Sequence, residues 1–391
     1  MKIAKKSKRK NLLNEAPKLN SADPVILELW VRAGGRCEFH GCNTCLLQDK
    51  LTTNEAKLAD IGHIVARSKD GPRGNDPLPI KERNHINNLI LLCPNHHRLI
   101  DRKNLEKRFP KELLQKYKEE HENRIKYLAG LGPEYETVII RMVGNIRGHS
   151  ASISNEEIRS AVLKHANRYP RYLGNENNIE IDLTGLPNRS DKLYWQPGKQ
   201  KIDNVIDRLI NSAIDDKKIR HLSIFALARL PFLIYLGYRL GDKVPADFYQ
   251  KHRDSKEGWV WGKTGRKIIF KSTKLQSGRD NTKIALIISL SGKIVVDQLP
   301  SFINDDFTIY EIIPEGVAAN RNILQLRDNL DNFRACYQIL LRKIEKTHEK
   351  ARYIHFFPAI PVSAAIICGR ELLKNISPSL KIYDAGEKNL R

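Results

Sequence analysis

The chain has 391 residues, enough for two or three domains that each bury a core of their own. Its hydrophobic share of 41% and charged share of 29% are typical of globular proteins, and no stretch approaches the ~18 apolar residues of a membrane span. A net charge of +22, densest in the N-terminal third, favours a polyanionic partner. Charge alone does not separate DNA from RNA or from an anionic membrane surface.

The N-terminal segment is basic, and it is not followed by the apolar stretch of a secretory signal. We therefore expect a cytoplasmic protein without a membrane partner. Residues 1–20 combine Lys and Arg with a polar run, which predicts a basic disordered arm. Residues 24–33 then carry the apolar pattern of a short helix, preceded by a polar cap and ended by Gly34 and Gly35.

Residues 35–100 are dense in Cys, His, Gly and Pro, with only short apolar runs, as expected of a small fold that is held together by metal. A charged amphipathic helix is predicted over residues 110–128, and the segment LGPEYE at residues 131–136 has the composition of a linker. We assign residues 21–130 to a first domain and residues 137–391 to a second.

The second domain alternates short apolar runs with helical patterns. Strands are predicted at residues 136–144, 177–186, 221–230, 283–292, 307–314 and 352–361. Helices are predicted at residues 201–214, 231–242, 326–350 and 363–375. This alternation indicates a Rossmann-like α/β sheet, and its two rounds suggest a duplicated domain. The sequence shows no repeat and no GxGxxG loop.

Four of the six cysteines lie in the first hundred residues, whereas Cys336 and Cys368 have apolar neighbours and are expected in the core. Disulfides are not expected in a cytosolic protein. The motifs Cys37-x4-Cys42 and Cys93-x2-His96 instead have the spacing of two zinc knuckles that together supply four ligands. Cys45 is an alternative to Cys42, which we prefer. This pattern predicts a structural Zn²⁺ site.

Zinc alone does not account for three further residues between and beside these knuckles. His63 ends a short apolar run, Asn88 opens the run NLILLC, and His97 directly follows His96. The string RCEFHGC, DIGHIVARSKDGP, NNLILLCPNHHRLID resembles the HNH nucleases of the ββα-metal class. Hydrolysis of a phosphodiester needs a base with a pKa near neutrality and a cation that stabilises charge on the phosphate.

By this resemblance, His63 is the general base and His97 a ligand of a catalytic Mg²⁺ or Mn²⁺ ion. Asn88 matches the middle asparagine, which orients the base or the backbone around it. Many HNH members carry an acidic metal ligand directly before the first histidine, and here that position is Gly62. Asp60 is the nearest candidate, although it fits equally an acid at a turn or strand edge. Asp101 lies one helical turn beyond His97 and is expected on the same face.

Loops that follow predicted strands are the default ligand sites of an α/β domain. One basic interval, YQKHRDSKEGWVWGKTGRK, also mixes tryptophans with Lys and Arg, which suits a nucleotide if the rings are not core residues. The candidate ligand-binding residues are Arg229, Trp259, Trp261, Ser291, Phe357 and Pro358. The remaining histidines of the first domain, His40 and His85, are expected to be exposed to solvent.

The runs HLSIFALARLPFLIYLGYRLGDKVPADFYQKHRD, SLSG and IHFFPAIPVSAAIICGRELL resemble a SAVED domain, and this resemblance extends from residue 137 to the end. Such a domain consists of two fused CARF-like, Rossmann-type halves and senses cyclic oligonucleotides in bacterial CBASS anti-phage defence. The whole architecture is similar to the HNH–SAVED effectors. That resemblance implies binding of a cyclic dinucleotide, degradation of double-stranded DNA, and a homo-oligomer that is a dimer at rest and a tetramer or larger when activated.

The expected fold is thus an α+β ββα-metal nuclease domain containing zinc, followed by an α/β SAVED domain. Two other functions remain open at this point. One is a restriction-type HNH endonuclease whose C-terminal domain recognises DNA, and the other is a non-enzymatic, zinc-containing DNA-binding regulator. His63 and His97 count against the regulator, because a purely structural zinc knuckle needs neither residue.

Overall fold

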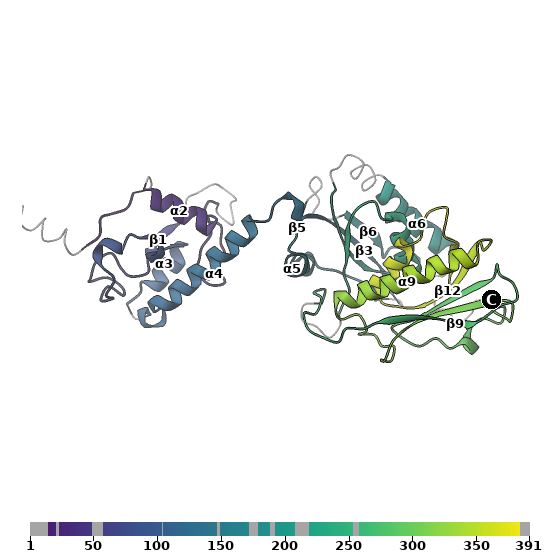
Figure 1. Ribbon diagram of the computed structural model, residues 1–391. Coiled ribbons are helices and arrows are strands. Elements are labelled where there is room, and N and C mark those ends of the chain that lie inside the picture. The colour runs from purple at the N-terminus through teal and green to yellow at the C-terminus, as the bar shows by residue number, and fades with distance from the viewer. Residues whose placement is uncertain are drawn as a thin grey trace, which may run out of the picture. The chain divides into compact units, whose positions relative to one another are not determined.

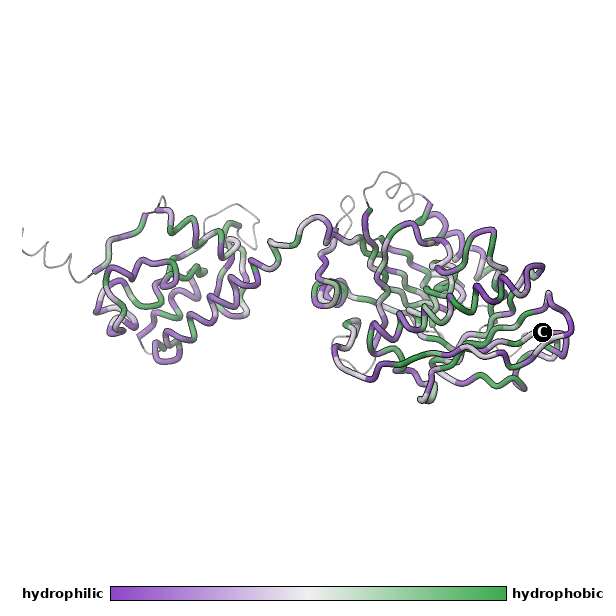
Figure 2. Tube along the Cα trace, viewed as in Figure 1, coloured by the Kyte–Doolittle hydropathy of each residue, from purple (hydrophilic) through white to green (hydrophobic). Residues whose placement is uncertain are grey.

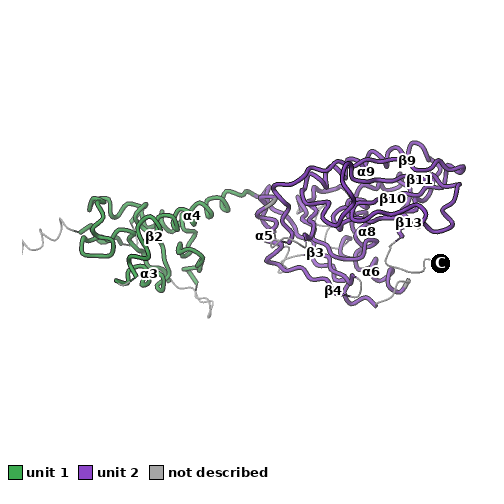
Figure 3. Tube along the Cα trace, turned by 90° about the horizontal axis from the view of Figure 1, so that it is seen from below, with its two compact units in different colours: residues 1–132 green, residues 133–391 purple. Residues whose placement is uncertain are grey.

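The computed structural model describes residues 15–20, 23–48, 58–103, 105–146, 149–171, 179–187, 192–207, 219–252 and 258–383. The chain divides into two compact units, unit 1 from Met1 to Gly132 and unit 2 from Pro133 to Arg391 (Figure 3). Among the described residues, no helix is long and apolar enough to cross a membrane.

Unit 1 is built around a two-stranded antiparallel sheet and the helix that follows it. Its elements are α2 (Pro24–Ala33), β1 (Asp60–His63), η1 (Ile80–Glu82), η2 (Ile86–Asn88), β2 (Leu89–Leu92), α3 (Pro94–Ile100), η3 (Glu106–Arg108) and α4 (Lys111–Ala129). The pairing of β1 with β2 aligns His63 with Leu89. Because α3 starts directly after β2, the strands and this helix form a ββα arrangement, as expected.

Helix α2 begins and ends where the sequence predicts. Pro24 occupies the first turn, where its missing N–H leaves no hydrogen bond unmade, and Gly34 ends the helix with a left-handed φ of 60°. Its inner face buries Leu29 and Ala33 against the β2 core. Helix α4 confirms the charged helix predicted over residues 110–128.

The prediction of a disordered arm is wrong for its last six residues. Ala16 is buried, its backbone N–H donates to the carbonyl of Arg67 (3.2 Å), and Asn84 Nδ2 donates to the carbonyl of Pro17 (2.9 Å). Residues 15–20 therefore pack on unit 1, which their polar sequence does not reveal. Residues 1–14 lie outside the described residues.

Unit 2 contains two sheets. The first half consists of η4 (Pro133–Tyr135), β3 (Glu136–Ile146), β4 (His149–Ser150), α5 (Asn155–Ala166), β5 (Tyr169–Pro170), β6 (Ile179–Leu183), α6 (Lys192–Val205), β7 (Leu222–Leu227), α8 (Leu230–Leu240) and β8 (Ala246–Phe248). The second half consists of β9 (Phe270–Gln276), β10 (Ile284–Ser289), η6 (Val296–Gln298), β11 (Thr308–Pro314), α9 (Arg327–Thr347), β12 (Tyr353–Ala359), α10 (Val362–Arg370) and β13 (Ser379–Ile382).

The two sheets repeat one topology. Parallel strands run in the order β6-β3-β7-β8 in the first half and β11-β10-β12-β13 in the second. Equivalent helices follow equivalent strands, since α6 and α9 precede the third strand and α8 and α10 follow it. Strand β9 adds an antiparallel edge beside β11. This repeat confirms the predicted α/β fold and its duplication, although the two halves share no visible sequence repeat.

The hydrophobic core of unit 2 follows from this layering. Strand β10 is buried along its whole length because it lies between two parallel neighbours, with both faces covered. Hydrophobic residues are concentrated along the strands (Figure 2). Helix α9 lies along the sheet of β9 and β12 (Figure 1), where Phe333 contacts the Phe270 ring and Asn332 donates to the carbonyl of Ile268.

Helices α8 and α10 pack more closely than ordinary side chains permit. A Cβ on Gly237 would lie 1.9 Å from the carbonyl oxygen of Ile366, and a Cβ on Gly369 would lie 1.8 Å from that of Ile234. Gly237 approaches Ile366, which lies three residues before Gly369. Gly369 in turn approaches Ile234, which lies three residues before Gly237, so the two contacts are equivalent. The two halves are therefore joined by a backbone crossing in which only glycine fits.

Several elements of unit 2 differ from the prediction. Helix α6 begins at Lys192, whereas the sequence pattern predicts a start at residue 201, because Pro197 within the helix obscures its first two turns. Residues 208–214 of that predicted helix lie outside the described residues. Helix α5 was not predicted, although the capping box of Ser154 and Glu157 marks its start. Strands β8, β9 and β13 were also missed, since they are short or carry the polar residues of an edge.

The helix crossing gives a direct test of stability. We expect Gly237→Ala to lower the free energy of unfolding by about 1–3 kcal/mol, because the added methyl group forces α8 and α10 apart. Chemical denaturation measures the change. Gly185→Ala is the matched control, since no atom lies within 4 Å of the Cβ it adds. Equal stability of the two variants would show that the helices do not depend on this close approach.

Candidate active site

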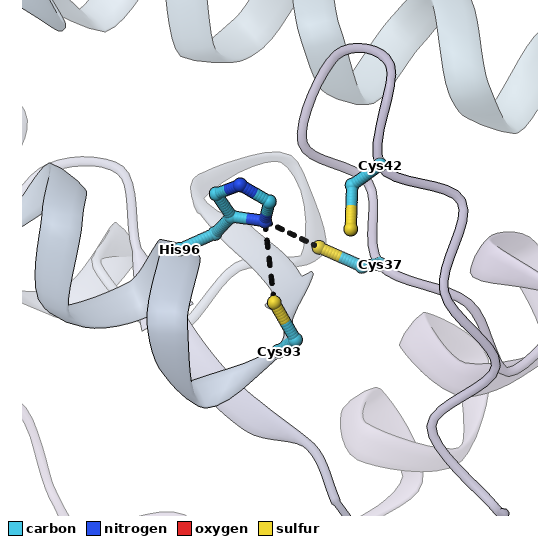
Figure 4. Close-up of side chains that lie close together, drawn as sticks. All are labelled: Cys37, Cys42, Cys93 and His96. Atoms are coloured by element: carbon cyan, nitrogen blue, oxygen red, sulfur yellow. Dashed lines mark hydrogen bonds between the residues drawn. The ribbon is translucent and has the colours of Figure 1, made fainter. Parts of the chain in front are cut away.

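The four predicted zinc ligands come together in unit 1. One ligand atom from each of Cys37, Cys42, Cys93 and His96 lies within 4.8 Å of the other three (Figure 4). His96 Nδ1 is 3.2 Å from Cys93 Sγ and 3.6 Å from Cys37 Sγ. Cys45 is not part of this group. These separations suit a tetrahedral ion with Zn–S bonds of about 2.3 Å.

The surroundings of the cluster also fit a structural zinc ion. Burial raises the pKa of Cys37 to about 12, so that its thiolate needs a compensating charge, and a divalent cation among these sulfurs would supply one. The Phe39 ring stacks on the His96 imidazole, with centroids 4.0 Å apart and planes 3° from parallel. This contact fixes the orientation of the ring whose Nδ1 faces the sulfurs.

His63 lies at the end of β1 and is held by a residue that the sequence analysis did not single out. Its Nε2 is 3.0 Å from Asn84 Oδ1, which can only accept, so that Nε2 carries the proton and the Nδ1 lone pair remains available. Burial is the largest cause of a lowered pKa for His63, and the Arg67 cation lowers it further. A neutral imidazole with an available lone pair has the form that a general base requires.

Asn88 orients the backbone rather than the base. Its side chain is buried, accepts a hydrogen bond from the Val65 N–H (2.8 Å), and donates to the carbonyls of Val65 (2.9 Å) and Arg83 (2.8 Å). Val65 lies just after His63 in the chain, and Arg83 lies just before η2. Asn88 thus fixes the path of the chain as it leaves β1, and Asn84 fixes the imidazole itself.

Two arginines close the loop between β1 and η1. Arg83 is 1% exposed and donates to the carbonyls of Ala66 (2.6 Å) and Gly74 (2.8 Å). Arg73 donates to the carbonyls of Ile64 and Ile100 (2.9 Å to the latter). Buried guanidinium groups that are bonded to backbone carbonyls replace the core that this short segment lacks. Sequence reasoning gave neither residue a role, because an arginine in a basic chain carries no distinguishing signal.

His97 lies on α3 between two carboxylates. Its Nδ1 is 3.4 Å from Asp60 Oδ2, and its Nε2 is 3.4 Å from Asp101 Oδ2. Asp101 is also paired with Arg73 Nη2 (3.1 Å), so Asp60 is the acid with the fewer competing partners. Asp60 and His97 have the oxygen and nitrogen atoms that can hold a Mg²⁺ or Mn²⁺ ion. Helix α3 packs against β1, the strand that His63 ends, so the base and the His97–Asp60 pair belong to the same ββα arrangement.

The geometry explains why Gly62 replaces the acid expected before His63. A Cβ on Gly62 would lie 3.3 Å from His97 Cδ2 and 3.2 Å from a methyl group of Ile90. A larger side chain at this position would displace the His97 ring. Asp60 lies two residues earlier, on the same face of β1, because side chains alternate along a strand.

The candidate ligand-binding residues of unit 2 divide into two groups. Trp259 and Trp261 are 0% and 2% exposed and belong to the core, so the prediction that they stack on a ligand is corrected. Phe357 and Pro358 are also buried, and the Phe357 ring stacks on Tyr383. Their apolar surroundings, rather than a ligand, account for these residues.

Arg229 and Ser291 remain at the ends of strands. Arg229 is half-buried at the start of α8, with its guanidinium 4.7 Å from the centre of the Trp195 ring. The backbone N–H of Ser291 donates to the carbonyl of Ala359 (2.8 Å) and joins the loop after β10 to the end of β12. The outcome for the other residues agrees with expectation: His40 and His85 are exposed and Cys368 is buried.

The zinc cluster predicts a specific loss of structure. We expect Cys93→Ser to abolish zinc binding and to make unit 1 sensitive to protease, because the ion stabilises a segment with a small core. Metal analysis by mass spectrometry and limited proteolysis measure the two effects. Cys45→Ser is the control and should keep its zinc. Full zinc content in the Cys93→Ser protein would show that the ligand set is different.

Comparison with protein families gives two matches. Residues 37–105 match the family described as HNH endonuclease, and residues 202–389 match the family described as SMODS-associated and fused to various effectors sensor domain, or SAVED. The first range contains the zinc cluster, His63, Asn88 and His97. The second begins within α6 and covers the remainder of unit 2. Comparison with curated proteins gave no significant match.

Among solved structures, the chain is similar to the Cap4 SAVED/CARF-domain containing receptor of Acinetobacter baumannii, solved with the cyclic trinucleotide 3′3′3′-cAAA. The identity is 13%, the TM-score is 0.42, and the match covers 72% of this chain and 58% of that chain. The Cap4 receptor of Moraxella osloensis gives 14%, 0.39, 72% and 56% for the same quantities. The chain thus spans little more than half the length of these receptors. The family matches, rather than these distant likenesses, identify the chain as an HNH endonuclease domain at residues 37–105 fused to a C-terminal SAVED sensor domain.

Proposed function

We propose that this chain is a metal-dependent endonuclease that cuts double-stranded DNA when a cyclic nucleotide binds to its SAVED domain. The observation that carries the nuclease part is the arrangement of His63 and His97. A neutral imidazole held by Asn84 ends β1, and a His97–Asp60 pair suited to a divalent cation lies where α3 packs against the same strand. A zinc module with a purely structural role would need neither feature.

Each residue of the site has a separate role in the proposed phosphodiester hydrolysis. His63 Nδ1 takes a proton from the attacking water, while its Nε2–H stays bonded to Asn84. Asn88 keeps the backbone of β1 and the following loop in place, so that the base does not turn away. A Mg²⁺ or Mn²⁺ ion held by His97 and Asp60 would stabilise the negative charge that develops on the phosphate and the leaving oxygen. Asp101, paired with Arg73, positions the other side of the His97 ring.

The choice of DNA as substrate rests on charge. The chain carries +22, and its N-terminal third, residues 1–130, holds 26 Lys and Arg against 16 Asp and Glu, an excess of +10. Such a surface attracts any duplex through its phosphates and supports cleavage with little sequence preference. We propose that the chain acts in a CBASS-type anti-phage response, in which a silent nuclease is released only after infection.

The choice of ligand rests on the SAVED match, whose description names a sensor fused to effectors. A cyclic dinucleotide is the ligand that we propose, with a cyclic trinucleotide, as in the Cap4 complex, in the same chemical class. Arg229 and Ser291 at the strand ends are the proposed contacts. Ligand binding is proposed to convert a resting dimer into a tetramer or larger assembly that brings nuclease domains together.

Removal of the base gives the first test of this function. We expect His63→Ala to reduce plasmid cleavage by ~10²–10⁴-fold, with zinc content unchanged, because the base is lost while the zinc ligands remain. EDTA should stop cleavage by the unmodified protein, and added Mg²⁺ or Mn²⁺ should restore it. His85→Ala, a change at an exposed histidine, is the control. Near-normal cleavage by the His63→Ala protein would rule out this residue as the base.

Control by ligand gives the second test. We expect a cyclic dinucleotide to raise both particle mass and cleavage, since a change from mostly inactive to mostly active requires ~10⁴-fold tighter binding to the active state. Light scattering and plasmid cleavage are measured with and without a panel of cyclic di- and trinucleotides. Complete cleavage without any ligand, or no response to the whole panel, would favour a restriction-type nuclease whose C-terminal domain recognises DNA.

A further inference from the structure

The N-terminal segment, residues 15–20, is attached to unit 1 by several kinds of contact. Glu15 forms an ion pair with Arg67 in the loop after β1. Ala16 is buried, and its backbone N–H donates to the carbonyl of Arg67 (3.2 Å). Leu19 packs against the hydrophobic core of the unit. A charged, a backbone and an apolar contact together fix the path of the segment, rather than one of its side chains alone.

The segment reaches the proposed base through Asn84. The Pro17 carbonyl accepts a hydrogen bond from Asn84 Nδ2 (2.9 Å), and Asn84 Oδ1 is 3.0 Å from His63 Nε2. One amide group therefore contacts the segment on one side and the imidazole on the other. A backbone carbonyl can only accept, so it keeps the NH2 group of Asn84 turned toward Pro17. The oxygen of the same amide then faces His63.

A half-turn of the Asn84 amide would reverse these roles. Its oxygen would meet the Pro17 carbonyl with no hydrogen between the two acceptors, and its NH2 group would face His63 Nε2. Nε2 would then have to accept, so the proton of the neutral ring would lie on Nδ1. Nδ1 is the atom that takes a proton from water in the proposed reaction, and a protonated Nδ1 cannot do so. The Pro17 carbonyl thus disfavours the amide orientation that would disable the base.

The backbone around Asn84 is already fixed by other contacts. Arg83, the preceding residue, is buried and donates to the carbonyls of Ala66 and Gly74, while its own carbonyl accepts from Asn88. Rotation about the last bond of the Asn84 side chain exchanges its oxygen and nitrogen without moving this backbone. The orientation of the amide is therefore what the N-terminal segment contributes.

We propose that residues 15–17 complete the proposed active site, because the Pro17 carbonyl and Asn84 together hold His63 in the tautomer that can accept a proton. Pro17 and Asn84 are positioning residues, since both act through His63 and not on the substrate. The inference rests on the proposed role of His63 as general base. It makes cleavage depend on whether a segment with a polar sequence is docked on unit 1.

Two variants of the full chain test the docking. Ala16→Arg places a long cation at a buried position, and Glu15→Arg replaces the ion pair with Arg67 by repulsion. We expect each to lower plasmid cleavage about fivefold, a typical effect of one lost hydrogen bond, with zinc content unchanged. Both changes add positive charge, so weaker attraction to DNA cannot cause the loss. Glu15 is partly exposed, so its variant remains informative even where the change at Ala16 impairs folding.

Lys18→Arg is the matched control for these variants. It places the same side chain at an exposed position of the same segment and keeps the charge of the chain. Its plasmid cleavage, measured with the activating cyclic nucleotide, should equal that of the unmodified chain. A loss as large as that of the Ala16 and Glu15 variants would show that the segment contributes something other than its docked position.

Asn84→Asp separates positioning from a general loss of structure. A carboxylate has two oxygens and no donor, so it accepts from His63 Nε2 in either orientation and does not need the segment. We expect Ala16→Arg or Glu15→Arg to change cleavage by less than about twofold in the Asn84→Asp chain, because the two positions are coupled. Losses of about fivefold in both backgrounds would show that the segment acts on structure alone.

The tautomer of His63 can be observed without DNA. In protein labelled with 15N-histidine, the ring nitrogen signals at a pH above neutrality show which nitrogen has the proton, and His63→Ala identifies the His63 signals among those of 12 histidines. We expect Nε2–H alone in the unmodified and Lys18→Arg chains, and an additional Nδ1–H form in the Ala16→Arg and Glu15→Arg chains. Unchanged signals in both of these variants, or Nδ1–H in the unmodified chain, would overturn the proposal. The expected spectra in a chain that cuts no DNA would instead contradict the proposed function.

Discussion

The close crossing of α8 and α10 is the contact on which the architecture of unit 2 depends. Gly237 and Gly369 let the two backbones approach so closely that a carbonyl oxygen of the opposing helix occupies the space a Cβ would need. This contact fixes the two α/β halves relative to each other. An ion pair between the buried Asp247 on β8 and the partly exposed Arg327 at the start of α9 joins the halves a second time.

Unit 1 is stabilised in a different way, because it has few apolar residues to bury. A cluster of three cysteines and one histidine, two arginines bonded to carbonyls and one buried asparagine take the place of a larger core. The arrangement also serves the chemistry. Cys93 and His96 belong to the first turn of α3, so an ion bound by this cluster would hold the helix from which His97 projects. The proposed structural metal and the proposed catalytic ligand His97 thus share one short helix, and loss of the metal is expected to displace His97.

The sequence by itself determined the features that depend on short-range patterns. The Cys-x4-Cys and Cys-x2-His motifs specify a tetrahedral ligand set because the ligand spacing itself restricts the geometry. The Gly34 stop of α2 and the alternation of strands and helices in unit 2 follow from short-range preferences in the same way. The resemblance of the two halves of the chain to HNH and SAVED domains rests on these motifs as well, and the family matches confirm it.

Tertiary structure decided which side chains meet. The HNH motif singles out Asn88 and not Asn84, yet Asn84 holds the His63 imidazole and Asn88 holds the backbone. Aromatic and basic residues near Trp259 resemble a nucleotide site in sequence, but the fold buries the rings, because burial depends on what packs against a segment. The glycine crossing is a contact between elements that are far apart in the chain. Composition and spacing therefore specify the chemistry that this protein has available, and packing determines where that chemistry is placed.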